Sequence, residues 1–301
     1  MHRTVLLNEA IDGLDLNSHS VVVDATFGGG GHSAEICKRY PGIKIIALDQ
    51  DESAWEYTGN KFKDLNCSIS FINENFRDLD KVLRTNIDGI IFDLGLSSDQ
   101  LENSGRGFSF LKNESLLMTM KKNPRPEDVT AMDVVNTWSE ENLAKIIYGY
   151  GEEKFSKRIA RGIVETRVKD KIKTTLDLVK IIEGAVPARF VRAPARRAVY
   201  KRGRLHFATR TFQALRIAVN DELGALAEGL EKGFKFLKKG GRMAVISFHS
   251  LEDRIVKKFY KTKEVEGLGK LMNKKVILPS DDEIKNNPRS RSAKLRIIQK
   301  E

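Results

Sequence analysis

The 301-residue sequence predicts a doubly wound α/β fold that is interrupted by a helical insertion. In roughly the first hundred residues, short apolar runs rich in valine and isoleucine alternate with stretches of helical character. Continuous apolar strands separated by helices are typical of a parallel sheet covered on both faces. Between these strands and their resumption near residue 209, only polar turns and amphipathic helices are found. We therefore expect one discontinuous α/β domain at 1–103 and 209–301 and an inserted helical domain at 104–208.

Five buried strands and three helices between them follow from this pattern. Each strand is a short apolar run that ends at a glycine or a polar residue, and each helix is an amphipathic stretch. The strands are expected at 21–24, 44–49, 68–72, 87–93 and 242–248, the helices at 33–40, 52–63 and 76–84, and a terminal strand pair at 275–278 and 294–298.

Further helices are expected inside the insertion and after it. Amphipathic periodicity predicts helices over 133–148 and 155–168, and Thr174 is the expected N-cap of a third. Apolar residues then recur every three or four positions over 212–237, which indicates more helical structure. After the fifth strand, Ser250 is the expected N-cap of the helix that follows.

The strongest signal in the composition is positive charge. The chain has 52 lysines and arginines against 41 aspartates and glutamates, which gives a net charge of +11 and an isoelectric point near 9.5. Such an excess favours a polyanionic partner, and nucleic acid is the commonest one. The alternative is a basic but otherwise ordinary enzyme.

Composition also argues against several classes of protein. No apolar stretch approaches the ~20 residues that span a bilayer, and Glu9 interrupts the N-terminus before a signal-peptide core can form. Cys37 and Cys67 cannot form a disulfide framework and lack the spacing of a zinc site, and the five histidines form no ligand cluster. We therefore expect a soluble protein in a reducing cytoplasm, with no membrane partner and with chemistry that uses no metal.

Four consecutive glycines, Gly28 to Gly31, stand between the first strand and the helix after it. In this fold, backbone N–H groups meet a ligand at that helix N-terminus, and glycine lets the backbone approach closely. A dinucleotide fingerprint would need a glycine at Ser33, and a P-loop would need a lysine after the glycines. A ligand loop is favoured over a simple tight turn, because four glycines cost backbone entropy on folding.

Two acidic residues at strand ends narrow the choice of ligand. Asp49 ends the second strand about twenty residues after the loop, where an acid typically accepts hydrogen bonds from a ribose diol. NAD and S-adenosylmethionine both present such a diol, so Asp49 does not separate them. Asp24, just before the loop, favours S-adenosylmethionine, whose amino-acid moiety is compact and cationic. Both acids are also compatible with solvated strand ends.

From Asp93 onward the chain carries long phrases in a fixed order. Together with the loop at 26–33, these phrases resemble the RsmH/MraW family of 16S ribosomal RNA cytosine-N4 methyltransferases, and the resemblance covers nearly the whole chain. The phrases lie at 93–101, 106–110, 150–153, 206–217, 245–254 and 287–292.

The resemblance implies a Rossmann-like sheet that binds S-adenosylmethionine, and methylation of the exocyclic N4 of a cytidine, at position 1402 in the decoding centre of 16S rRNA. The partner it implies is 16S rRNA in the small ribosomal subunit, and a homodimer is compatible with the sequence. Asp93 is the candidate catalytic acceptor for the amino hydrogens, because it ends the fourth strand where reacting groups meet. Carried over by motif, the cofactor contacts are Gly30, Gly31, His32, Asp49, Phe76, Asp93 and Gln100.

The chain departs from the family on the expected substrate side. Where members usually read Leu-Asp-Met-Arg-Met-Asp, Leu117, Thr119 and Lys121 replace two acids and an arginine. Two other functions compete with methyl transfer. A nicotinamide-dependent dehydrogenase would use the same loop and Asp49, and a non-catalytic RNA-binding ribosome assembly factor would retain the cofactor fold.

The insertion is expected to be the main RNA-recognition surface. Seven basic residues and no acid lie between Arg189 and Arg204, with Phe190 and Tyr200 among them. Basic side chains contact phosphates, and aromatic faces stack on unpaired bases. The alternative is a solvated basic loop. The candidate RNA-binding residues are Arg189, Arg192, Arg196, Arg197, Lys201, Arg202 and Arg204.

Overall fold

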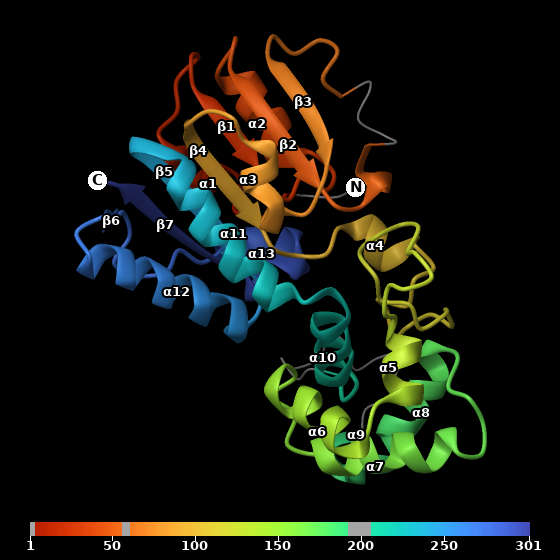
Figure 1. Cartoon of the computed structure of the whole chain (residues 1–301). Coiled ribbons are helices and arrows are strands. Elements are labelled where there is room, and N and C mark those ends of the chain that lie inside the picture. Colours follow the sequence, from red (N-terminus) through yellow and green to blue (C-terminus); the bar gives the residue numbers. More distant parts are fainter. Residues whose placement is uncertain (1–3, 56–60, 192–205) are drawn as a thin grey trace. The chain divides into compact units, whose positions relative to one another are not determined.

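The computed structural model describes residues 4–55, 61–191 and 206–301 (Figure 1). The chain divides into two compact parts, which we call the α/β unit (Met1–Ser97 with Leu223–Glu301) and the helical unit (Ser98–Glu222). The division falls at 97/98 and 222/223, whereas the sequence pattern suggested 103/104 and 208/209. The helix at Thr209–Asn220, which the sequence pattern placed in the α/β domain, therefore belongs to the helical unit.

A seven-stranded sheet forms the centre of the α/β unit, in the order β3-β2-β1-β4-β5-β7-β6. The first five strands are parallel, and β7 and β6 continue the sheet antiparallel beyond β5. The strand order reverses between β1 and β4, which is the arrangement of a Rossmann-like sheet. The strands are β1 (Val21–Asp24), β2 (Lys44–Asp49), β3 (Ser68–Asn73), β4 (Ile87–Asp93), β5 (Leu237–Ser247), β6 (Gly269–Leu271) and β7 (Lys294–Lys300).

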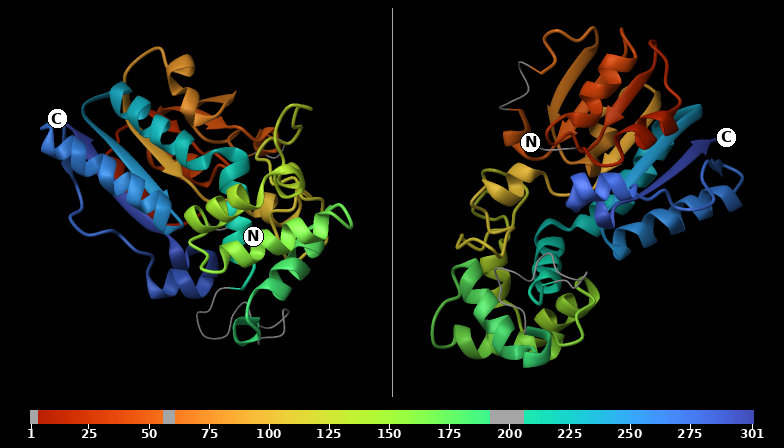
Figure 2. Two further views of the ribbon diagram at one scale, coloured as in Figure 1. Left: turned by 60° about the horizontal axis from the view of Figure 1, so that its bottom comes forward. Right: turned by 180° about the vertical axis from the view of Figure 1, so that it is seen from behind.

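Helices cover both faces of this sheet (Figures 1 and 2). Two pack on one face through a core that includes Ile11, Ile36 and Ile45. Three pack on the other face through a core that includes Leu79, Leu230 and Tyr260. This double coverage explains why the central strands read as continuous apolar runs. The helices are α1 (Leu7–Leu14) and α2 (Gly31–Arg39) on the first face, and α3 (Leu79–Val82), α11 (Glu222–Phe236) and α12 (Ser250–Val265) on the second.

All five predicted strands form, although β5 begins five residues earlier than predicted, and two of the three helices predicted between them are wrong in extent. The expected helix at 52–63 is described only as the 3-10 turn η1 (Glu52–Trp55), and 56–60 lie outside the described residues. The expected helix at 76–84 is a 3-10 turn, η2 (Phe76–Asp78), followed by the single turn of α3. Of the expected terminal strand pair, β7 forms, whereas 275–278 contributes one bridge between Ile277 and Leu295.

One disulfide joins Cys37 of α2 to Cys67, the residue before β3. The sequence reasoning excluded a disulfide framework and did not anticipate this single bond. The side chain of Cys37 packs in the core beneath α2, and β3 lies at the edge of the sheet on the same side. This packing brings the two Cα atoms to 5.4 Å, although the residues are 30 positions apart. Cysteine usage consequently no longer supports a reducing compartment.

The helical unit contains seven described helices and no strand of the sheet. The expected helix at 133–148 is two helices, because Ser139 begins a new one with its own side-chain cap. Thr174 caps the third helix as predicted, in a capping box with Asp177. The helices are α4 (Ser98–Glu102), α5 (Ala131–Thr137), α6 (Glu140–Gly149), α7 (Ser156–Arg167), α8 (Thr175–Ala185), α9 (Ala188–Val191) and α10 (Thr209–Asn220).

Two local details differ from the sequence expectation. Over 212–236 the apolar stripe belongs to α10 and α11, which are separated by Asp221 in a left-handed conformation with φ 46°, and the last residue of the stripe, Leu237, already begins β5. The N-cap of α12 is His249 and not Ser250: its ring accepts a hydrogen bond from the backbone of Glu252. Among the described residues, no helix is both long and apolar enough to cross a membrane.

Candidate functional site

Three aspartates end three neighbouring strands at the carboxyl edge of the sheet. Asp24 ends β1, Asp49 ends β2 and Asp93 ends β4, and β1 lies between the other two. This edge, next to the point where the strand order reverses, is where open α/β sheets bind their ligands. The topology therefore brings together two predicted site residues, Asp49 and Asp93, and the acid that favoured S-adenosylmethionine.

Asp24 fixes the glycine-rich loop. Its carboxylate accepts hydrogen bonds from the Ser33 hydroxyl at 2.6 Å and from the Thr26 backbone N–H at 3.3 Å. The side chain is buried, and burial raises the pKa of Asp24 to about 6 despite these two donors. Asp24 thus holds both ends of the loop and places negative potential beneath it.

Asp49 faces the same loop from β2. One carboxylate oxygen accepts a hydrogen bond from the Gly28 backbone at 2.7 Å, and the other accepts one from the Asp51 backbone at 2.9 Å. Each carboxylate oxygen can accept a second hydrogen bond, so the group still has the capacity to bind a vicinal diol. Burial raises the pKa of Asp49 to about 6, and the charges of Asp51 and Asp24 add to this effect.

Asp93 lies beside His32, with 3.8 Å between one carboxylate oxygen and Nδ1 of the imidazole. The other oxygen, Oδ1, is buried and has no hydrogen-bond partner among the described residues. Burial raises the pKa of Asp93 to about 7, and the negative charges of Asp24 and Glu252 contribute to the rise. A buried carboxylate oxygen without a donor is costly, and a ligand that supplies an N–H group would satisfy it.

The glycine-rich loop leads directly into α2. Gly28 and Gly30 have φ of 50° and 66°, a conformation that side chains rarely adopt. A Cβ on Gly31, the first residue of α2, would lie 1.8 Å from the hydroxyl oxygen of Thr4. Lys61 donates a hydrogen bond to the Gly29 carbonyl. Two glycines of the loop are therefore required by backbone conformation and one by close packing.

The carboxylates at this edge fit the cofactor that the sequence suggested. Three carboxylates with raised pKa values, one buried and two half-buried, gain from a nearby positive charge. S-adenosylmethionine carries a sulfonium and an ammonium group together with a ribose diol. A nicotinamide dinucleotide instead brings a diphosphate, which three carboxylates would repel. The electrostatics of the edge therefore favour S-adenosylmethionine.

The stability of the cofactor-free protein should depend on these acids, and the direction follows from their pKa values. Folding raises the three pKa values, so the folded state binds protons more tightly and is favoured by protonation. This stabilisation is complete below pH ~4 and is lost as the pH rises through about 6 to 7.

Asp93→Asn, which stays neutral, should therefore gain stability over the wild type as the pH rises from about 4 to about 8. The gain should be about 1.4 kcal/mol for each tenfold difference in proton affinity between the folded and unfolded states. Urea unfolding at several pH values measures it. Wild-type and variant profiles that run parallel would contradict the raised pKa of Asp93.

Phe76, a predicted cofactor contact, is half-buried and packs against the core of the α/β unit. Its ring meets Phe92 edge to face, with 5.5 Å between centroids. A Cβ on Gly229 of α11 would lie 2.7 Å from the ring, so α11 packs closely on it. Phe76 begins the turn after β3, at the same edge as Asp49. These contacts account for its apolar character, and its contact with the adenine remains a prediction.

The remaining predicted residues belong to the helical unit. Gln100 is buried in α4. Arg189 is an exposed residue of α9, where the basic run begins. Six of the predicted RNA contacts lie outside the described residues: Arg192, Arg196, Arg197, Lys201, Arg202 and Arg204.

The motif phrases of the helical unit contact one another. The Phe110 ring stacks on the His206 ring, with 4.6 Å between centroids and 9° between planes. The Gln213 side chain donates to the Tyr150 carbonyl at 2.9 Å. A Cβ on Gly151 would lie 2.5 Å from the Arg210 carbonyl oxygen. Much of the length of these phrases is therefore explained by packing within the unit.

The segment at 117–121, which departs from the family pattern, is held in place by contacts with Arg106 and Asp128. The Arg106 guanidinium donates to the carbonyls of Thr119 and Met120, at 3.3 and 2.7 Å. Thr119 is buried, and Lys121 forms an ion pair with Asp128 at 2.9 Å. The lysine that replaces an acid thus has a partner within the same unit.

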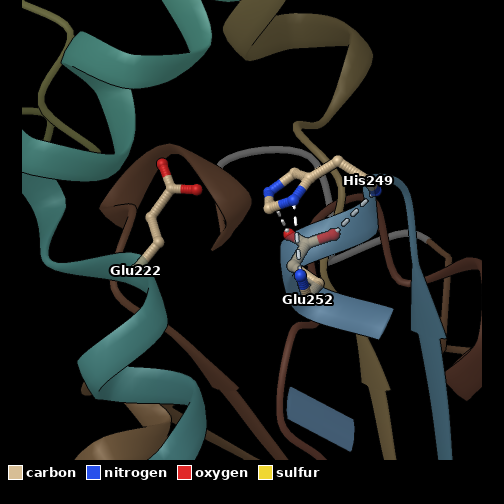
Figure 3. Close-up of side chains that lie close together, drawn as sticks. All are labelled: Glu222, His249 and Glu252. Carbon is tan, nitrogen blue, oxygen red and sulfur yellow. Dashed lines mark hydrogen bonds and ion pairs between the residues drawn. The ribbon is translucent and has the colours of Figure 1, made fainter. Parts of the chain in front are cut away.

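Sequence reasoning missed the positioning roles of several residues. Thr26 accepts a hydrogen bond from the Asp93 backbone N–H at 2.6 Å, which ties the glycine-rich loop to β4. Glu252 accepts from the backbones of Phe248 and His249, at 2.8 and 3.2 Å, and fixes the turn after β5 (Figure 3). The only sequence signal for these roles is their position next to strand ends.

Comparison with known proteins supports the interpretation of this edge as the cofactor site of a methyltransferase. The sequence profile of the MraW methylase family matches residues 1–301. A relative from Limosilactobacillus fermentum (strain NBRC 3956 / LMG 18251), named ribosomal RNA small subunit methyltransferase H, is 42% identical over 322 residues, which cover 99% of this chain and 98% of the relative. A relative of the same name from Sulfurihydrogenibium sp. (strain YO3AOP1) is 46% identical over 301 residues, with 98% of both chains covered.

The family profile spans the whole chain, and the two relatives match it nearly from end to end. The glycine-rich loop and the strand-end aspartates lie together at the ligand-binding edge of the sheet. The chain therefore belongs to the MraW methylase family.

Proposed function

We propose that this protein transfers a methyl group from S-adenosylmethionine to the exocyclic N4 of a cytidine in 16S rRNA, at position 1402 of the decoding centre. As a member of the MraW methylase family, the protein is an rRNA methyltransferase whose cofactor is S-adenosylmethionine. The choice of atom and nucleotide goes further, and the environment of Asp93 supports it. The substrate would be the small ribosomal subunit or its precursor, in the cytoplasm.

The single observation that carries the proposal is the buried, unpartnered Oδ1 of Asp93. An exocyclic amino group presents two N–H donors, and one of them would satisfy this oxygen. Because the amino lone pair of cytosine is delocalised into the ring, a hydrogen-bond acceptor that helps the nitrogen pyramidalise favours attack. A ring carbon or a ribose hydroxyl would offer this oxygen one donor or none.

Asp93 also suits the proton balance of the reaction. S-adenosylmethionine, when bound, supplies a methyl group on a positively charged sulfur. The amino nitrogen that receives a methyl group must lose one proton, and the Asp93 carboxylate can take it. Burial raises the pKa of Asp93 to about 7, which is close to the value at which a general base works best in neutral solution.

The cofactor would be held by the predicted residues of the α/β unit. Asp49 would accept hydrogen bonds from the ribose hydroxyls, and the backbone of Gly30 and Gly31 would approach the amino-acid end. His32 lies between that loop and Asp93 and would keep water from the reacting atoms. Positioning of this kind can contribute ~7–11 kcal/mol to lowering the barrier. Phe76 completes the proposed set within the α/β unit, and Gln100 of the helical unit is the remaining proposed contact.

RNA recognition is assigned to the helical unit and its basic run, as the sequence predicts. Changing Arg196, Arg197, Arg202 and Arg204 together to glutamine should weaken RNA binding and leave the affinity for S-adenosylmethionine unchanged. Each lost phosphate contact should flatten the slope of log affinity against log salt by about 0.7 to 0.9. Filter binding at several salt concentrations measures the slope. An unaltered slope together with an unaltered methylation rate would show that the basic run is a solvated loop without a role in RNA binding.

The proposal is tested with purified protein, radiolabelled S-adenosylmethionine and small ribosomal subunits that lack the modification. We expect label in 16S rRNA, and N4-methylcytidine as the labelled nucleoside after digestion. Label in a different nucleoside would contradict the choice of atom. Binding of RNA and cofactor without transfer would instead favour the alternative, a non-catalytic ribosome assembly factor that retains the cofactor fold.

A further inference from the structure

We propose that the turn that follows β5 and the turn that precedes β7 form a binding subsite for the target nucleotide. In this subsite, Phe248 stacks on the base and Arg291 contacts its phosphate. This inference rests on the proposed function and names residues of the α/β unit that the candidate site above does not include. Four observations carry it: strand register, a ring contact, a rigid turn and the distribution of charge.

Strand register places both turns at the edge that carries Asp93. Asp93 of β4 is the partner of Ile246 in β5, and Phe248 follows two residues later. Ser247 in turn pairs with Lys294, the first residue of β7. Because β7 runs antiparallel to β5, the residues before Lys294 lie beside the residues after Ser247 (Figure 1). Phe248 therefore follows the strand next to β4, and the turn that precedes β7 lies one strand further along the same edge.

The Phe248 ring contacts the loop that follows Asp93. A Cβ on Gly95 would lie 2.9 Å from Cε2 of this ring, so the ring and the loop backbone are packed together. The ring is half-buried against the core of that face. The backbone N–H of Phe248 donates to Glu252 at 2.8 Å, which fixes the residue at the start of α12. An aromatic face thus stands next to the proposed amino acceptor.

The chemistry of an amino-directed methyl transfer requires such a face. The target base must leave its stack so that its edge reaches the acceptor, and an extruded base is commonly held by stacking on aromatic side chains. The residues after Asp93, Leu94, Gly95 and Leu96, offer no aromatic ring. Phe248, from the neighbouring strand, supplies one, and Gly95 leaves room for it.

The turn before β7 presents basic residues from a rigid base. The 3-10 turn η3 (Pro288–Ser292) buries Ser290, whose hydroxyl donates to the Asn287 carbonyl at 2.8 Å, and the next residue, Ala293, is also buried. Arg289 and Arg291 alternate with these residues and are exposed. The alternation anchors the backbone in the core and leaves both arginine side chains exposed.

Asp253, in the first turn of α12, is paired with residues of β7. Asp253 is engaged by Arg296 at 2.7 Å and by Lys294 at 3.3 Å. A guanidinium group matches the geometry of a phosphate and binds it with two hydrogen bonds. The subsite therefore offers a stacking face for a base and, beside it, a cation for the phosphate of the same or the adjacent nucleotide.

The base contact is tested by Phe248→Leu in the full-length protein with small ribosomal subunits and S-adenosylmethionine. Loss of one stacking contact should raise the KM for RNA roughly tenfold or more, and Phe248→Tyr should restore it. The affinity for S-adenosylmethionine should stay at the wild-type value in both variants, which also shows that they fold. Phe71→Leu is the matched control, because it removes a ring that is 41% exposed on the edge strand β3.

The phosphate contact is tested by Arg291→Gln. The slope of log RNA affinity against log salt should become flatter by about 0.7. The matched control is Arg84→Gln, an exposed arginine before β4 and hence at the opposite edge of the sheet. This control should leave the slope unchanged.

The outcomes separate the subsite from the proposed function. Wild-type protein that forms N4-methylcytidine, with the expected effects at Phe248 and Arg291, supports both. If the wild-type protein forms this product and Phe248→Leu behaves like the control Phe71→Leu, the stacking contact alone is overturned. An unaltered salt slope in Arg291→Gln overturns the phosphate contact alone. Wild-type protein that forms no N4-methylcytidine overturns both the subsite and the function on which it rests.

Discussion

Asp93→Asn should lower the turnover of methyl transfer by ~10²–10⁴-fold, the range typical of a lost general base. The amide keeps the shape of the side chain but cannot accept a proton. Binding of S-adenosylmethionine should weaken much less than turnover, because the oxygen that would face the amino group is Oδ1, which is buried without a partner. Single-turnover rates and calorimetric titration of the cofactor measure the two effects separately.

The pH dependence of wild-type turnover should report the ionisation of Asp93. Burial raises the pKa of Asp93 to about 7 in the cofactor-free protein, and the positive charge of bound S-adenosylmethionine lowers it. Because the ionised form is the proton acceptor, turnover at saturating cofactor should rise with pH, with a midpoint below that value. Asp88→Asn is the matched control, since Asp88 lies near the opposite end of β4, where it accepts a hydrogen bond from the Val21 backbone at 2.8 Å. Equal losses of turnover and cofactor affinity in Asp93→Asn would instead make Asp93 a cofactor contact only.

Asp49→Ala should weaken binding of S-adenosylmethionine by about tenfold or more, which corresponds to the ~1.5–3 kcal/mol of a hydrogen bond to a charged group. The carboxylate would lose the ribose hydroxyls, and the Gly28 backbone would lose its acceptor at 2.7 Å. Titration of the purified protein with the cofactor measures the change.

Asp64→Ala is the matched control for Asp49→Ala, because Asp64 is an exposed acid of the same unit that lies before β3. Wild-type affinity in Asp49→Ala would exclude Asp49 from the ribose site. Titration with NAD provides a second comparison, since the three strand-end carboxylates should disfavour its diphosphate.

The strands and the acids at their ends could be predicted because burial on both faces leaves a simple pattern. Val21–Asp24 and Ile87–Asp93 are apolar runs that end in an acid, and the observed strands have the same bounds. Once the sheet is parallel, its topology places those acids at one edge. Asp49 and Asp93 could therefore be proposed before any distance was known.

Features that depend on tertiary contacts could not be predicted in the same way. The Cys37–Cys67 disulfide requires α2 to pack beside the edge strand, which nothing in the spacing of two cysteines indicates. The break at Asp221 leaves the apolar period intact, so α10 and α11 read as continuous. His249 caps α12 because Glu252 completes a capping box with it, whereas serine is the commoner cap by residue type.

The site residues missed by the sequence reasoning share a physical cause. Thr26 and Glu252 act through backbone N–H groups of other residues, and such contacts leave no mark on residue type. Phe248 resembles an ordinary core residue until its contact with Gly95 is known. Much of the 150–153 and 206–217 phrases proves to hold the helical unit together.

The central claim is methylation of N4 of one cytidine in 16S rRNA, and mass analysis of that RNA from a strain without this gene tests it most directly. The account predicts that the fragment containing position 1402 loses the mass of one methyl group, and that the wild-type gene restores it while the Asp93→Asn gene does not. A fragment of unchanged mass in the strain without the gene would contradict the account.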